Sequence, residues 1–316
     1  MTWHHENKAG GEVMRHPSDS LAWKSFDGLH QSFSADPRNV RLALASDGFQ
    51  PFAHSKTPYS IWPVVLIPYN LPPSMIMKPS NFILSMLIPG PESPGDAIDV
   101  YLQPLIEDLK DLWEEGVTTF DSSKRQNFHL RATLLWTIND FPAYANLSGW
   151  STKGRLACPV CSKDTKYEWL YNGRKFCYMG HRCWLSNGHR WRKDKDAFDG
   201  TIEKRGQPRI FSGDEVLDQV QDLEGNPLTK CQKVKVKISH DERGDNWKKK
   251  SIFFYLPYWK TLLLRHNLDV MHIEKNVCDN VLGTIMNLKG KTKDTMKARL
   301  DLVEMKLRAE LHPNRE

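Results

Sequence analysis

One apolar segment restricts the fold of this chain more than any other feature. The segment ATLLWTIN, residues 132–139, is almost continuously apolar, and the acidic residue Asp140 follows it directly. Such a run is typical of a parallel strand that is buried on both faces of a sheet. Soon afterwards comes the pair Cys158-Pro-Val-Cys161, which has the spacing of a metal-binding turn. A buried strand that brings a carboxylate to its own end, close in sequence to paired cysteines, predicts a metal-dependent site.

Three further apolar runs precede this strand, and a helical segment separates them from it. Residues 39–47, 61–67 and 82–88 have strand character and are joined by links rich in turn residues. Apolar side chains then recur at helical spacing over residues 98–112, and Gly116 is placed to end that helix. This order predicts an α/β fold with a mixed sheet, made of an antiparallel meander, a crossover helix and a fourth strand parallel to the first.

Two acids stand at the ends of the first and fourth predicted strands. Asp47 follows the first strand and Asp140 follows the fourth. If these strands are parallel neighbours, the two carboxylates lie at one edge of the sheet, where they can share Mg²⁺ ions for phosphoryl transfer. The competing interpretation is that each aspartate only caps a turn. The equivalent positions of the two acids favour the metal site.

The cysteine pair predicts a second, softer metal site. Six cysteines in a chain of 316 residues do not suggest a disulfide framework, and Cys158 and Cys161 supply half of a tetrahedral zinc site. The missing ligands have three sources. The first source is distant, His266 and His272. The second is local and consists of Cys177, His181, Cys183 and His189. The third is a mixture of distant and local residues.

Charge is unevenly distributed along the chain. Residues 1–150 carry 11 basic and 16 acidic residues, whereas residues 151–209 carry 14 basic and 6 acidic residues. Basic sequence that contains several tryptophans suits a polyanion such as nucleic acid, although a solvated lysine-rich surface has the same composition. No apolar run of about 18 residues occurs, so we expect no membrane span, and no secretory leader is visible.

Long segments of the sequence resemble a known family. The strings RNVRLALASDGFQPF, WPVVLIPYNLPP, LIPGPESPG, TINDFPAYANLSGWSTKG, CPVC and RHNLDVMHIEKNV, among others, are similar to those of the transposases encoded by plant CACTA (En/Spm) elements. The resemblance extends from about Trp3 to His312 and covers nearly the whole chain.

The resemblance implies a DDE/D transposase with an RNase H-like core. Such an enzyme uses Mg²⁺, or Mn²⁺ in its place, to cut DNA at the transposon ends and join the freed ends to target DNA. It implies Asp47 and Asp140 as the first two catalytic acids. By analogy with related recombinases, Cys158 and Cys161 pair with His266 and His272 around structural zinc, with His181 as the alternative ligand. It also implies a nuclear protein that binds terminal repeats, self-associates and works with a companion DNA-binding protein of the same element.

The third acid of the family is absent from its expected place. It should be a glutamate beyond a large helical insertion, and no counterpart of that segment occurs; Glu274 and Glu304 are the nearest substitutes. Both ends of the chain fall inside the family's pattern, which predicts a truncated and inactive fragment. The alternative function is a degenerate or domesticated module that binds DNA or protein without catalysis.

The predicted organisation has five parts. We expect a polar and irregular lead-in, then the catalytic core, a zinc-binding region, a basic loop or insertion, and a helical segment that begins the insertion domain. In the helical segment, residues 261–290 are predicted to be one helical stretch. The five predicted ranges are 1–38, 39–157, 158–193, 194–250 and 251–316.

Overall fold

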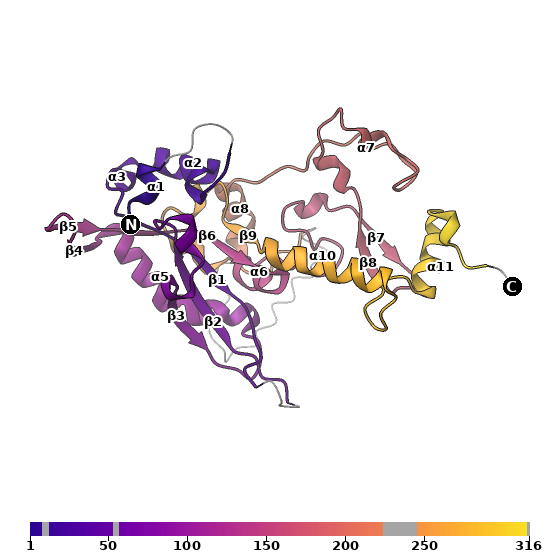
Figure 1. Cartoon of the computed structure of the whole chain (residues 1–316), viewed down its shortest axis with the longest axis horizontal. Helices are drawn as coiled ribbons and strands as arrows, with labels where there is room; N and C mark the ends of the chain where they lie inside the picture. Colours follow the sequence, from indigo (N-terminus) through magenta and orange to yellow (C-terminus); the bar gives the residue numbers. More distant parts are fainter. Residues whose placement is uncertain (8–12, 53–56, 224–244, 315–316) are drawn as a thin grey trace. The chain divides into compact units, whose positions relative to one another are not determined.

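The computed structural model describes residues 1–7, 13–52, 57–223 and 245–314 (Figure 1). These residues divide into two compact units. Unit 1 contains the described parts of 1–150, together with 211–223 and 247–269. Unit 2 contains 151–210, 245–246 and 270–314.

Unit 1 is built on a five-stranded mixed sheet whose strand order is β3-β2-β1-β6-β9. Strands β1, β2 and β3 form the predicted antiparallel meander, and β6 pairs with β1 in parallel. A third parallel strand, β9, pairs with the other edge of β6. The α/β class and the mixed sheet predicted from sequence are therefore confirmed. The strand bounds are Val40–Ser46 (β1), Trp62–Pro68 (β2), Ile83–Ile88 (β3), Ala132–Asn139 (β6) and His266–Leu268 (β9).

The predicted crossover helix is α5, Ile98–Glu114, which lies beside the sheet in Figure 1. Its apolar stripe, which includes Leu102, Ile106 and Leu109, is buried in the core with β1 and β6. Gly116 follows the helix with φ +67°, a left-handed conformation that costs glycine little and ends the helix. The other helices of unit 1 are Trp3–Glu6 (α1), Leu21–Leu29 (α2), Gln31–Ser34 (α3), Pro73–Ile76 (α4), Phe141–Ser148 (α6) and Gly213–Val220 (α8).

The described residues of the predicted irregular lead-in, 1–7 and 13–38, contain the helices α1, α2 and α3, contrary to the sequence prediction. The hydroxyl of Ser20 accepts a hydrogen bond from the backbone N–H of Trp23 and caps α2. Trp23, Phe26 and Phe33 then project from α2 and α3 into the core of unit 1. The prediction failed because only three large apolar residues, spread over two short helices, carry the burial, and this is too few to give a visible period.

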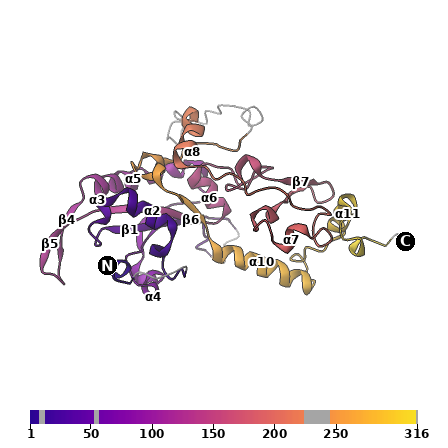
Figure 2. The ribbon, with the colours of Figure 1, turned by 90° about the horizontal axis from the view of Figure 1, so that it is seen from above.

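A short hairpin, β4–β5, interrupts the predicted passage from α5 to β6. Strands Val117–Asp121 and Gln126–Leu130 pair antiparallel and extend away from the sheet, as Figure 2 shows. The carboxylate of Asp121 accepts from the backbone N–H groups of Ser123 and Lys124 and stabilises the turn. The hairpin buries little apolar surface, and this explains why hydrophobic periodicity did not reveal it.

The helix predicted over residues 261–290 is partly wrong. Residues 266–268 form β9, and the helix α10 spans only Val270–Ile285. The backbone N–H of Thr137 donates to the carbonyl of Arg265, which holds this segment extended along β6. Pairing with a buried strand overrode the helical propensity of the leucine-rich sequence, since propensity is a weak preference that tertiary contacts can reverse.

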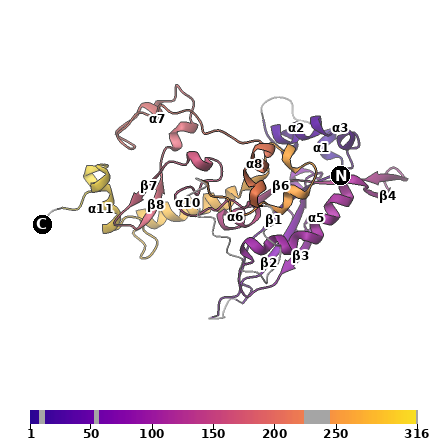
Figure 3. The same cartoon turned by 180° about the vertical axis from the view of Figure 1, so that it is seen from behind.

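Unit 2 has few regular elements. A two-stranded hairpin, β7–β8, lies beside α11, and Figure 3 shows the two together. The carboxylate of Asp301 joins them by accepting from the backbone N–H groups of Asn172 and Gly173 at 2.8 and 2.9 Å. The bounds are Tyr167–Leu170 (β7), Lys175–Tyr178 (β8), Arg190–Lys193 (α7), Val270–Ile285 (α10) and Met296–Met305 (α11), and a 3-10 helix spans His181–Trp184.

Part of the predicted basic loop, residues 224–244, lies outside the described residues. Among the residues that are described, no helix is both long and apolar enough to cross a membrane.

Candidate functional site

The candidate site lies where the parallel strands of unit 1 end. The register pairs Ala45 of β1 with Ile138 of β6. Asp47 and Asp140 each come two residues after this pair, so they occupy equivalent positions at the carboxyl ends of neighbouring parallel strands. Adjacent strands are about 4.8 Å apart, so Ala45 and Ile138 lie side by side two residues before the acids. The arrangement on which the sequence prediction depended is therefore present.

Local structure fixes each of the two acids. Asp47 is exposed, and its carboxylate accepts a hydrogen bond from the backbone N–H of Gly48 at 2.7 Å. A Cβ on Gly48 would lie 2.6 Å from the indole nitrogen of Trp62, so this turn requires glycine. Asp140 is half-buried and caps α6, with its Oδ1 atom 2.8 Å from the backbone nitrogen of Ala143. Capping engages one carboxylate oxygen of Asp140 and holds the carboxylate at the first turn of α6.

A third acid, which the sequence reasoning did not place here, follows β9. Leu268 of β9 pairs with Asn139 of β6, so Asp269 stands level with Asp140 on the next strand. The backbone N–H of Asp269 donates to the carbonyl of Asn139 at 2.7 Å. A signal for it was available, because the chain has an aspartate directly after each of three apolar segments, at 47, 140 and 269.

Polar side chains on the strands themselves lie just behind these acids. The amide of Asn139 donates to Thr137 Oγ1 at 2.6 Å, and this hydroxyl lies 2.7 Å from Nδ1 of His266. Oδ1 of Asn139 and Oγ of Ser46 are buried without a hydrogen-bond partner among the described residues. Carboxylate, amide and hydroxyl oxygens therefore gather at this edge, and such hard donors fit Mg²⁺ better than zinc.

His266, one of the predicted zinc ligands, belongs to this polar network in unit 1. Its ring packs against Tyr144 and Trp259 at centroid distances of 5.4 and 5.5 Å. Burial, and to a smaller extent the charges of Arg265 and Lys249, lower the pKa of His266 to about 3, so the ring is neutral near pH 7. Because Nδ1 is engaged with Thr137, only Nε2 of His266 is left as a ligand atom.

The cysteine pair forms a tight turn in unit 2. The backbone N–H of Cys161 donates to the sulfur of Cys158 at 3.3 Å, and the N–H of Ser162 donates to the carbonyl of Cys158. Burial raises the pKa of the Cys161 thiol to about 12, and the neighbouring Cys158 adds to the rise. The Cys161 thiol is therefore protonated in the absence of metal, and a bound Zn²⁺ would displace its proton.

The other predicted ligands are distributed over unit 2. His181 is exposed at the start of a 3-10 helix, and Cys183 is buried two residues later. Cys177 is half-buried on β8, and His189 caps α7 by accepting from the N–H of Trp191. His272 lies half-buried on α10.

The two glutamates considered as third acids also lie in unit 2. Glu274 is exposed on α10, and Glu304 on α11 accepts a hydrogen bond from the side chain of Asn172.

Within the part of the chain that the structure describes, no three His, Cys, Asp or Glu side chains are grouped closely enough to hold a metal ion. The Mg²⁺ and Zn²⁺ ligand sets therefore stay predictions.

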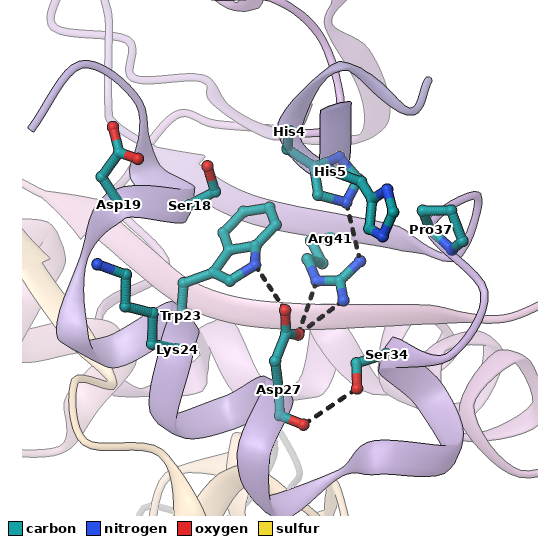
Figure 4. Close-up of a pocket in the computed structure, with 10 residues that line it drawn as sticks. All are labelled: His4, His5, Ser18, Asp19, Trp23, Lys24, Asp27, Ser34, Pro37 and Arg41. Carbon is teal, nitrogen blue, oxygen red and sulfur yellow. Dashed lines mark hydrogen bonds and ion pairs between the residues drawn. The ribbon is translucent and has the colours of Figure 1, made fainter. Parts of the chain in front are cut away.

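A polar cavity of about 410 Å³ lies elsewhere in unit 1, and Figure 4 shows the residues that line it. Arg41 of β1, which is 1% exposed, pairs with Asp27 of α2 at 2.6 Å. The second carboxylate oxygen of Asp27 accepts from the indole N–H of Trp23 at 3.0 Å. Arg41 and Asp27 neutralise each other, and their pair joins α2 to the sheet.

Comparison with protein families shows the family to which the chain belongs. The model of a transposase family, described as "Transposase family tnp2", matches residues 11–223. The chain belongs to this transposase family. Comparison with curated proteins finds no match. The matched range of the transposase family contains Asp47, Asp140, Cys158 and Cys161, and it ends before β9 and α10.

Proposed function

We propose that this chain is a transposase-derived protein of the CACTA (En/Spm) type, whose core carries out Mg²⁺-dependent cleavage and strand transfer on DNA. The observation that carries the proposal is the parallel register of β1 and β6, which places Asp47 and Asp140 at equivalent positions. Membership of the transposase family supports an action on DNA. The nuclear localisation, the self-association and the companion DNA-binding protein implied by the resemblance belong to the same proposal.

The sheet supports the finer assignment to an RNase H-like, DDE-type core. In the order β3-β2-β1-β6-β9, β2 runs opposite to the other four strands, and a helix crosses from the meander to β6. Such a sheet brings the carboxyl ends of β1, β6 and β9 to one edge, where ligands of α/β sheets commonly bind.

The chemistry follows from the oxygen donors at this edge. Asp47 and Asp140 would hold Mg²⁺, and Asp269 is the third carboxylate that the register supplies. Bound Mg²⁺ supplies an activated nucleophile and neutralises charge on the phosphate. The protein's own part is to orient the acids through the α6 cap and the Gly48 turn. We expect free metal to bind weakly, because Mg²⁺ completes its shell with water and substrate phosphates.

Binding of Mn²⁺, a spectroscopic substitute for Mg²⁺, tests this proposal. Paramagnetic titration in the presence of DNA should show at least tenfold weaker Mn²⁺ binding for Asp47→Asn, Asp140→Asn and Asp269→Asn. Asparagine still caps helices well, so Asp140→Asn removes the charge while α6 keeps its start. The control is Asp108→Asn, an exposed acid on α5.

Nicking of DNA that carries transposon ends is the second measurement, and it should require Asp47 and Asp140. Unchanged Mn²⁺ binding in both variants would refute the carboxylate site. Metal binding without any nicking would instead favour the non-catalytic module.

We also propose that Cys158 and Cys161 hold a structural Zn²⁺. The N–H···S hydrogen bond within their turn supports this, because it stabilises sulfur that carries negative charge. His272 is in the same unit as the cysteines, as are the alternatives His181 and Cys183. His266 remains the fourth ligand that the resemblance implies.

Elemental analysis of purified protein tests the zinc proposal. The wild type should contain one zinc per chain, and Cys158→Ser and His272→Ala should lose it. Cys278→Ser, which changes an exposed cysteine on α10, is the matched control and should keep its zinc. Full zinc content in Cys158→Ser would remove this cysteine from the site, and loss in His181→Ala but not in His272→Ala would select the local ligand.

A further inference from the structure

A cavity of about 300 Å³ in unit 2 has a basic wall and lies entirely within residues 161–209. Lys166, Arg205 and Arg209 contribute its positive charge, and Gly180 and Gly206 bring the backbone close to it. Arg205 and Arg209 are exposed, and Lys166 is half-buried. The exposed acid Asp164 also lines the cavity, as do Cys161 and Cys183, which are candidate zinc ligands. Three basic residues and one acidic residue therefore contribute to its wall.

Arg205 is fixed in place before any ligand binds. Its guanidinium donates to both carboxylate oxygens of Glu203, at 3.0 and 2.7 Å. The Glu203 side chain is 5% exposed, whereas that of Arg205 is 45% exposed, so the pair presents its cation to solvent. On the other side of Arg205, Gly180 has φ +76°, and a Cβ there would lie 2.1 Å from Nη2 of Arg205. Glycine at this position leaves the space that the guanidinium occupies.

Two buried arginines hold the loop that carries Arg205. Arg192, which is 3% exposed, donates to the carbonyl of Arg205 and to three carbonyls of residues 182–185. Arg182, which is 2% exposed, donates to the carboxylate of Asp199 at 2.6 Å and to the carbonyl of Thr201 at 3.0 Å. A loop without helix or strand is thus anchored along its length, and its exposed arginine loses little conformational freedom when it binds a ligand.

We infer that this cavity binds a phosphodiester group of DNA, with Lys166, Arg205 and Arg209 as the contacting cations. The inference rests on the proposed function, because it takes DNA as the substrate of the protein. An arginine with a planar, pre-positioned guanidinium is well suited to phosphate oxygens. Lys166 also pairs with Asp199 at 3.6 Å, which keeps its ammonium near the loop.

The salt dependence of DNA binding provides the test. Fluorescence anisotropy with a labelled duplex of random sequence gives the dissociation constant at several salt concentrations. Each lost phosphate contact should lower the slope of log K against log salt by about 0.9. We expect Arg209→Ala and Lys166→Ala each to lower the slope, and the double variant to lower it by about one such step in total, because a single phosphodiester group carries one charge.

The control is Lys195→Ala, which removes an exposed charge of unit 2 that does not line the cavity. Arg205→Ala would leave Glu203 buried without its partner, so Arg205→Gln is used with a thermal unfolding measurement as a check on folding. If the wild type binds DNA and the cavity variants keep the slope of Lys195→Ala, the phosphate site is refuted and the proposed function stands. If the wild type shows no salt-dependent DNA binding, both are overturned.

Discussion

Hydrogen bonds hold both the parallel strands β1, β6 and β9 of unit 1 and the loop of unit 2 that carries Arg205, but the donors differ. At the sheet edge, backbone N–H groups of one strand bond carbonyls of the next, and side chains such as those of Asp47 and Asp140 follow at the ends. In the loop, the guanidinium groups of Arg182 and Arg192 supply the donors for backbone carbonyls.

The two kinds of hydrogen bond make the two units sensitive to mutation in different ways. A backbone ladder spreads its stability over many residues, and no single side chain is indispensable to it. The Arg182 guanidinium instead satisfies the carbonyls of Trp191, Asp194 and Thr201 together with the carboxylate of Asp199. When one such group is lost, several part-buried acceptors lose their partner at once, and each costs part of its desolvation free energy.

The largest expected effect is therefore that of Arg182→Lys. Lysine keeps the charge but cannot reach four acceptors in a fixed plane, and we expect a loss of about 3–5 kcal/mol in the stability of this region. Hydrogen exchange should show the loss of protection over residues 181–205, while the strands of unit 1 keep theirs.

Leu102→Ala is the matched variant in unit 1. It truncates a fully buried side chain of α5 and should cost about 2–5 kcal/mol, with faster exchange in β1 and β6. If Arg182→Lys left exchange in residues 181–205 unchanged, the distinction between the two units would fail.

The same contrast explains how much could be predicted from the sequence. Apolar runs revealed β1, β2, β3, β6 and α5, because their burial imposes a regular pattern on the chain. The acids Asp47 and Asp140 were found through that pattern, since each directly follows a strand. The short strand β9 was missed because its partner β6, and not its own composition, makes it extended, and Asp269 was missed with it.

Unit 2 shows the limit of charge counting. Arg182 and Arg192 belong to the basic excess that predicted nucleic-acid binding, yet both are buried and bond carbonyls of their own unit. Nothing in a single sequence separates them from the exposed Arg205, because burial of an arginine depends on acceptors that the fold brings together. The charge pattern therefore indicated a region rich in cations and could not say which of them are exposed.

The stability of the two units should also depend differently on pH, although this effect is smaller than that of the core substitutions. In unit 1, burial and then the charge of Arg41 lower the pKa of His4 from 6.5 to about 3. In unit 2, hydrogen bonds from Arg205 lower the pKa of Glu203 from 4.5 to about 2. Both pKa values are lower in the folded state, so both groups favour unfolding when they take up protons. The pH ranges over which the two groups lose their stabilising contributions differ, however, because the pKa values of the two groups in the unfolded state differ.

As the pH falls, protonation of His4 should lower the stability of the protein before protonation of Glu203 does. The stability that its neutral form provides is complete above pH 6.5 and is lost toward pH 3, by about 1.4 kcal/mol for each pH unit. The contribution of Glu203 is complete above pH 4.5 and is lost only below it, toward pH 2. Between pH 6.5 and 4.5, unit 1 should therefore lose protection against hydrogen exchange through His4 while Glu203 still stabilises unit 2.

His4→Gln isolates this effect, because glutamine cannot take up the proton. The variant should flatten the pH dependence of unit 1 by about 1.4 kcal/mol per pH unit between pH 6.5 and 4.5, as measured by urea unfolding with exchange as the local probe. His5→Gln changes the exposed neighbour and should leave the dependence as it is in the wild type. Equal flattening in the two variants would mean that the buried contact of His4 with Arg41 does not cause the loss.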